Sequence, residues 1–159
     1  MPFPWSLAEN CKIVTGINPS AGAAVVGDYV SMKNVHKCWA IIMSSGGAAN
    51  AATFGVNEAT AVLPASADAV AAVMPWWGNE STGATDTLVR LAVDAATYTT
   101  DGNATAKLII VEIDPSILTG VHDCICVTEG ASAAGNITSV VYVLAERFQQ
   151  ATPPSAILD

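Results

Sequence analysis

The stretch that decides the fold is Lys107-Leu108-Ile109-Ile110-Val111-Glu112-Ile113-Asp114, and Pro115 follows it directly. An apolar run of this length, rich in Ile and Val, is typical of a β-strand. Pro115 ends the strand because proline has no N–H to donate to a neighbouring strand. We therefore expect a strand over residues 107–114, followed by a single helical turn over residues 115–118. Such a strand needs partner strands elsewhere in the chain.

Apolar runs of strand length recur on both sides of this stretch. In residues 36–43, period-two alternation gives two faces, one with Lys37, Trp39, Ile41 and Met43 and the other with His36, Cys38, Ala40 and Ile42. Turn-forming groups of Gly, Asn, Asp and Ser separate the runs. Short strands about a dozen residues apart predict an all-β fold, and we favour an antiparallel β-sandwich of the jelly-roll type. Further strands are expected over residues 25–32, 51–62, 85–93, 96–100, 122–127 and 137–145.

One segment, residues 65–74, competes as a helix. It contains helix-forming residues and a potential cap at Ser66. Pro64 and Pro75 confine any helix to this short stretch, and a loop or a strand fits the sequence nearly as well.

The 159 residues are the right length for one domain, which we place over residues 1–159. Residues 1–20 look extended and predict an N-terminal arm. Residues 149–159 follow the last expected strand and contain Pro153-Pro154, which favour an extended polyproline-like path. The Ile157-Leu158 tip of this tail would then dock on a neighbouring molecule or on the flank of the domain itself.

Composition excludes some classes of protein and disfavours others. Apolar residues make up 52% of the chain and charged residues 13%, which excludes intrinsic disorder. The net charge of −8 disfavours nucleic-acid binding, because a protein that neutralises phosphates needs basic residues. The longest charge-free stretch, residues 38–57, is interrupted by Ser44-Ser45-Gly46-Gly47, so we expect no membrane span. The first residues lack the pattern of a secretory signal, and we expect a soluble protein.

The low proportion of charged residues also indicates whether the chain works alone or in an assembly. A small monomer usually carries charge at its surface to remain dispersed, and large apolar patches mark partner surfaces. We therefore expect the chain to bury part of its surface in an assembly.

Histidine and cysteine residues offer a candidate metal site. On a strand, His122, Cys124 and Cys126 would share one face, as would His36 and Cys38. These ligands are one residue apart, whereas structural zinc sites usually have two to four residues between ligands. Buried cysteine also serves as a small apolar residue, so we favour core packing with reduced thiols, no metal and no cofactor.

No set of residues predicts catalysis. The two histidines give a Ser-His-Asp triad little to build on, and no phosphate-binding loop is present. We therefore expect a protein that is not an enzyme.

The aromatic residues point to surfaces. Trp76-Trp77 lies in an expected loop, with Asn79 nearby, and could fill an interface, cap the core or stack on a sugar ring. We favour interface or core over sugar. The interface candidates are Phe3, Trp5, Trp76, Trp77, Pro153, Pro154, Ile157 and Leu158.

The sequence of residues 33–159 resembles that of a known protein family. The segments that carry it are residues 33–37, 85–88, 98–101, 107–114, 122–127, 130–134, 139–147 and 150–154. In this arrangement the chain resembles the small β-sandwich virion proteins that tailed bacteriophages encode among their structural genes.

The resemblance implies a structural role without catalysis. Such proteins are typically capsid decoration (cement) subunits or components near the head–tail junction. It would place the chain on the capsid exterior after synthesis in the host cytoplasm, bound to the major capsid protein or other virion proteins. It also implies a homo-oligomer, with a trimer favoured. A glycan-binding or receptor-binding module on the virion is the alternative role.

Overall fold

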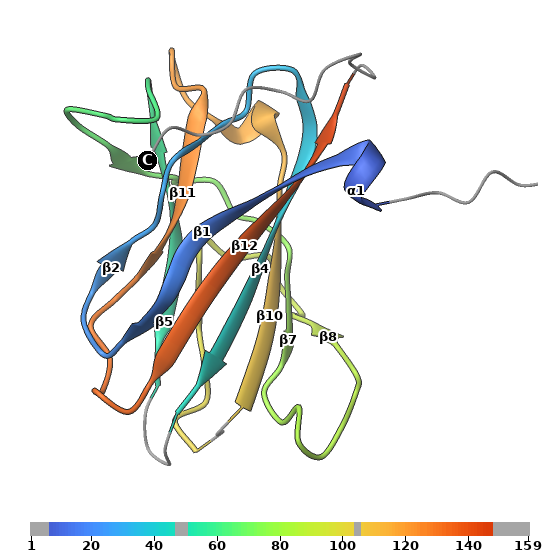
Figure 1. The fold of residues 1–159 in the computed structure, drawn as a ribbon, viewed down its shortest axis with the longest axis vertical. Helices are drawn as coiled ribbons and strands as arrows, with labels where there is room; N and C mark the ends of the chain where they lie inside the picture. The colour runs from blue at the N-terminus through green and yellow to red at the C-terminus, as the bar shows by residue number, and fades with distance from the viewer. Residues whose placement is uncertain (1–6, 47–50, 104–105, 148–159) are drawn as a thin grey trace, which may run out of the picture.

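The computed structural model describes residues 7–46, 51–103 and 106–147, and it is an antiparallel β-sandwich (Figure 1). Sheet A contains six strands in the order β1 (Cys11–Ala21), β12 (Ile137–Glu146), β4 (Val35–Ser45), β10 (Ala106–Ile113), β7 (Trp76–Asn79) and β8 (Val89–Arg90). Its long strands run side by side across the front of the view in Figure 1.

Sheet B packs behind sheet A and consists of shorter strands. Its order is β2 (Val25–Val26), β11 (Cys124–Glu129), β5 (Thr53–Ala59) and β6 (Asp68–Ala69), with β3 (Val30–Ser31) also on β11 and β9 (Thr97–Thr99) also on β5. Two short helical elements complete the described chain, α1 (Leu7–Asn10) and the 3₁₀ turn η1 (Pro115–Ile117).

The strand pairing is nested, as in a long hairpin that has been rolled up. The first long strand, β1, pairs with the last, β12, while β2 and β3 pair with β11. Further in, β4 pairs with β10, and β5 pairs with β6 and β9. Successive strands therefore pass back and forth between the two sheets, which is the jelly-roll topology expected from the sequence.

The core lies between the sheets and is made of the inward-facing residues of the long strands. Cys38, Ala40 and Ile42 of β4 are fully buried there, as are Ile109 and Val111 of β10. The alternation predicted for residues 36–43 is thus confirmed, with β4 extending slightly beyond it.

Several expected strands are shorter than predicted. Residues 25–32 form two short strands separated by Gly27–Tyr29, and of residues 85–93 only Val89–Arg90 pairs. The interruption falls where the Asp28 N–H donates to the Gly16 carbonyl of β1 at 2.7 Å and not to β11, next to Gly27, where a side chain would contact backbone oxygens.

For residues 65–74, where the sequence left helix, loop and strand open, the structure has loop and the short strand β6. No helix forms over residues 65–74, since the Val70 N–H donates to the Val56 carbonyl and the Met74 N–H to the Ala95 carbonyl. Burial of Val70 and Met74 in the core therefore overrides the helix propensity of the alanines.

The expected arm over residues 1–20 is mostly part of the domain. Residues from Cys11 onward form β1, which pairs with β12 through most of its length. Residues 1–6 and the tail over residues 149–159 lie outside the described residues, as do Phe3, Trp5, Pro153, Pro154, Ile157 and Leu158.

Candidate interaction surface

The face of sheet A that points away from the core is itself apolar, and we call it the outer face. It is built from rows of side chains that run across neighbouring strands in register. The longest row crosses all six strands and contains Thr15, Val141, Ile41, Ile110, Trp77 and Arg90. Flanking rows contain Ile13, Val143, Trp39 and Glu112 on one side and Ser139, Met43 and Leu108 on the other.

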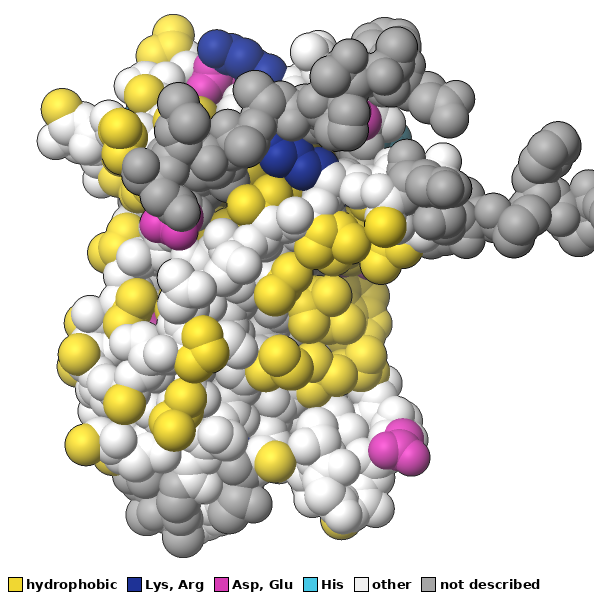
Figure 2. Space-filling view, viewed as in Figure 1, with side chains coloured by type: hydrophobic (Ala, Val, Ile, Leu, Met, Phe, Trp, Pro, Cys, Tyr) yellow, Lys and Arg dark blue, Asp and Glu magenta, His cyan; other side chains and the backbone are white. Residues whose placement is uncertain are grey.

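This apolar face is accessible in the single chain. Met43 is 53% exposed and Ile13 is 47% exposed, while Trp39, Ile41 and Ile110 are half-buried. Figure 2 shows the hydrophobic side chains gathered over β12, β4 and β10, next to α1. A hollow of about 320 Å³ lies among them and is lined by Leu7, Cys11, Trp39, Ile41, Ile110, Val143 and Ala145.

Period-two geometry explains why the face exists. In β10, Ile109 and Val111 fill the core, so Leu108 and Ile110 must point outward. An antiparallel sheet with one solvated face alternates apolar and polar residues, whereas β10 is apolar at both sets of positions. This continuous apolar run was the signal in the sequence for a second apolar face.

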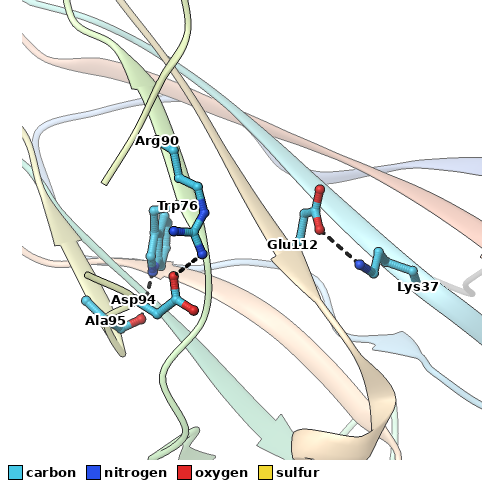
Figure 3. A network of polar contacts seen from close by, with 6 residues as sticks. All are labelled: Lys37, Trp76, Arg90, Asp94, Ala95 and Glu112. Atoms are coloured by element: carbon cyan, nitrogen blue, oxygen red, sulfur yellow. Dashed lines mark hydrogen bonds and ion pairs between the residues drawn. The ribbon is translucent and has the colours of Figure 1, made fainter. Parts of the chain in front are cut away.

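Charged side chains on the outer face are paired. The Lys37 ammonium lies 2.9 Å from the Glu112 carboxylate, with both side chains partly exposed (Figure 3). At the other end, the Arg90 guanidinium lies 2.6 Å from the Asp94 carboxylate, and its central carbon lies 5.6 Å from the centroid of the Trp77 ring. The charges of these two pairs cancel, so the face carries no net charge within the registered rows.

The adjacent tryptophans have opposite environments. Trp76 is fully buried against Tyr98 and donates its indole N–H to the Ala95 carbonyl at 2.8 Å, as Figure 3 shows. Trp77 lies on the outer face. The segment expected to be a loop is the strand β7, in which neighbouring side chains point to opposite faces. Trp76 is therefore a core residue and not an interface residue.

Asn79 does not offer its amide to a sugar. Its Nδ2 donates to the Thr85 carbonyl at 2.7 Å and its Oδ1 accepts from the Ser81 N–H at 2.9 Å. Of the three residues considered for glycan contact, only Trp77 reaches the surface.

The cysteines and histidines do not converge. Cys38 lies in the core between the sheets, whereas Cys124 and Cys126 pack with Tyr29 on the far side of sheet B. His36 is exposed. Among the described residues, no group of three or more His, Cys, Asp or Glu side chains could hold a metal ion. All four cysteines are free thiols, and burial raises the pKa of Cys38 to about 12 and of Cys126 to about 11.

Two buried carboxylates accept hydrogen bonds from neighbouring residues, although Glu129 Oε2 has no partner among the described residues. Glu58 accepts hydrogen bonds from the Thr119 N–H at 2.8 Å and from the Thr119 hydroxyl, and His122 Nδ1 lies 3.2 Å away. Burial opposes ionisation of Glu58, but these contacts outweigh it and lower the pKa. The second carboxylate belongs to Glu129, which accepts from the hydroxyls of Thr138 and Ser132, both at 3.1 Å. Burial raises the pKa of Glu129.

No protein-family model, curated protein or solved structure matches the chain. In the part of the chain that the structure describes, no helix is both long and apolar enough to cross a membrane.

Proposed function

We propose that this chain is a structural subunit of a larger protein assembly, and specifically a capsid decoration (cement) subunit on the head of a tailed bacteriophage. The observation that carries the proposal is the apolar outer face, which a chain working alone would leave in contact with water. The choice of a phage capsid as the assembly rests on the resemblance of the sequence to phage virion proteins.

The chemistry of the described residues supports assembly over catalysis. The buried carboxylates of Glu58 and Glu129 are held by neighbouring hydroxyl groups, and the charged pairs at the outer face are satisfied within the chain. Such a subunit would work by burial, because covering apolar side chains in each contact stabilises the particle by about 25 cal/mol per Å² of apolar surface removed from water.

The fold is compatible with this role but is not evidence for it. Jelly-roll sandwiches occur in viral capsid proteins and also in lectins and cupins, so the topology alone does not select a function. Burial of Trp76 and the internal bonds of Asn79 weigh against the glycan-binding alternative.

The test is retention on empty, expanded capsids of the phage that encodes the chain. We expect the purified protein to sediment with capsids that lack their decoration subunit. Met43→Glu and Ile13→Glu should weaken retention at least about tenfold, because each would place an unpaired charge on the outer face, which the assembly covers whether the covering molecule is the shell or another subunit. Val121→Glu adds the same charge at a side chain that is 79% exposed and lies off sheet A, and it should be retained as wild type.

Electron microscopy of intact particles with a labelled antibody separates the proposed locations. Label spread over the shell supports decoration, and label confined to the neck or tail supports a junction component. Absence of the chain from particles, together with failure to bind capsids, would overturn the proposal.

A further inference from the structure

We propose that the outer face binds a second copy of this chain, so that two molecules pack their A sheets against each other in a two-fold pair. This inference rests on the proposed function in one respect only, namely that the outer face is covered in the working protein. It adds the identity of the partner at that face, which the proposed function leaves open.

The pairing of charges on the outer face favours self-association through this face. Two copies that each carry a net charge of −8 repel one another over most of their surfaces. The outer face is different, because Lys37 neutralises Glu112 and Arg90 neutralises Asp94 within each copy. These four side chains therefore add no net charge to the repulsion between two molecules that approach through this face.

Composition makes the face complementary to itself. Its central side chains are Ile41, Ile110, Val141 and Trp39. Apart from the indole N–H of Trp39, these side chains have no group that needs a hydrogen-bond acceptor or an opposite charge on the partner. In a two-fold pair the same patch lies on both sides of the contact, so the patch must be complementary to itself. An uncharged apolar surface meets this requirement because it contains no charges that would face like charges. Sheets that pack face to face in this way lie about 10 Å apart, as in the core of a sandwich.

The area is sufficient for a reversible pair. The longest row crosses six strands, which at ~4.8 Å between strands is about 24 Å wide. From Lys37 to Met43 the face is about 20 Å long at ~3.4 Å per residue. Because the flanking rows cross only four and three strands, two such faces bury at most roughly 1,000 Å² together, which is at the lower limit for a specific interface. We therefore expect a pair that dissociates on dilution.

Residues 1–6 could cover only a small part of the outer face. Leu7, the first described residue, lines the hollow, so the six residues before it are an alternative occupant of the face. Six extended residues reach about 20 Å, however, and one extended chain is about one strand spacing wide. Such a segment would cover about one strand of the six and leave most of the face in water.

Analytical ultracentrifugation of the full chain over a range of concentrations tests the pair. We expect a monomer–dimer equilibrium that strengthens as salt is raised, because salt screens the repulsion between the acidic copies. Met43→Glu and Ile13→Glu should each raise the dimer Kd at least about tenfold. Both side chains are about half exposed in the single chain, so the substitutions leave the core intact.

Matched controls place the same charge elsewhere. Leu63→Glu and Val121→Glu alter side chains that are 78% and 79% exposed and lie outside sheet A. They change the net charge by the same amount as the outer-face variants and should leave the dimer Kd within about twofold of wild type. Equal effects in both groups would show that net charge, and not the outer face, governs association.

The Cys11 thiol reports on the face directly, because it lines the hollow. Its reaction with a thiol reagent should slow as the protein concentration rises and the pair forms. Three results would overturn the inference: a monomer at every concentration, a trimer, or faster labelling of Cys11 in the monomer after residues 1–6 are deleted. A monomer that still binds capsids would leave the proposed function standing, and a pair that ignores capsids would leave the present inference standing.

Discussion

Ile41 on β4 and Ile110 on β10 lie directly opposite each other on the outer face of sheet A. Their neighbours in sequence, Ile42 and Ile109, are fully buried between the two sheets. Sheet A is therefore apolar on both of its faces, and only one of them is covered in the single chain. Folding and association should consequently depend on alternate residues of the same strands.

Adjacent residues of β4 should separate these two contributions. Ile42→Ala leaves a cavity in the core and should lower the free energy of unfolding by about 2–5 kcal/mol. Ile41→Ala should cost less than half as much, because its side chain is half-buried before the substitution. Urea denaturation at low protein concentration measures both values. Equal costs would mean that the outer face contributes to the stability of the monomer as much as the core does.

The four cysteines should differ in reactivity. Cys38, Cys124 and Cys126 are buried, whereas Cys11 is partly exposed on the outer face. We expect one thiol per folded chain to react with a thiol reagent at low protein concentration and the other three only after unfolding. Cys11→Ser should abolish the fast reaction. A second fast thiol in that variant would contradict the burial of the other three.

Glu129 should make stability depend on pH in a defined direction. Burial raises the pKa of its carboxyl in the folded chain. Such a group contributes stability below its unfolded pKa and loses that contribution as pH rises through the folded pKa. Glu129→Gln removes the titration, so the Tm of the variant minus that of wild type should become more positive as pH rises from about 4 to about 7.

The control for this measurement is Asp86→Asn, which changes an exposed carboxylate by the same chemistry. Its difference in Tm from wild type should vary less with pH than that of the Glu129 variant. A difference for Glu129→Gln that becomes more negative with rising pH would show that the carboxylate form is favoured by the folded chain.

Gly78 should not accept a side chain. A Cβ at this position would collide with the Tyr98 hydroxyl, which donates to the Glu80 carboxylate at 2.6 Å. We expect Gly78→Ala to cost about 1–3 kcal/mol of unfolding free energy, as overpacking does. Gly83→Ala is the matched control, because no atom lies within 4 Å of its added Cβ.

A double-mutant cycle tests the cause. Tyr98→Phe removes the hydroxyl that the new methyl group meets, so the cost of Gly78→Ala should be smaller in the Tyr98→Phe background. Additive costs for the two substitutions would assign the destabilisation to the backbone of β7 instead.

The sequence predicted the long strands β4, β10 and β12 well because they depend on local pattern, whereas β1 was expected to be an arm. The alternation in residues 36–43 places Ile42 inward and Ile41 outward whatever the partner strand is. The run that ends at Pro115 likewise becomes β10, and η1 follows it as expected. The low charge of the chain also led us to expect that part of its surface is buried in an assembly, and this stays a prediction.

Tertiary contacts decided the features that local pattern left open. Residues 65–74 favour a helix by composition, but Val70 and Met74 enter the core by pairing with β5 and with Ala95. Trp76 and Trp77 are indistinguishable by composition, and only the pairing of β7 with β10 sends one inward and the other outward.

Local spacing in the chain thus determined the strands β4, β10 and β12, their faces and the sandwich class, because side-chain alternation is a property of the extended backbone itself. Only the tertiary structure decided which strands are neighbours, and therefore that the outward residues of six of them form one apolar face with its charges paired. The reason is that Ile13, Ile41 and Ile110 are far apart in sequence, and strand register alone brings them together.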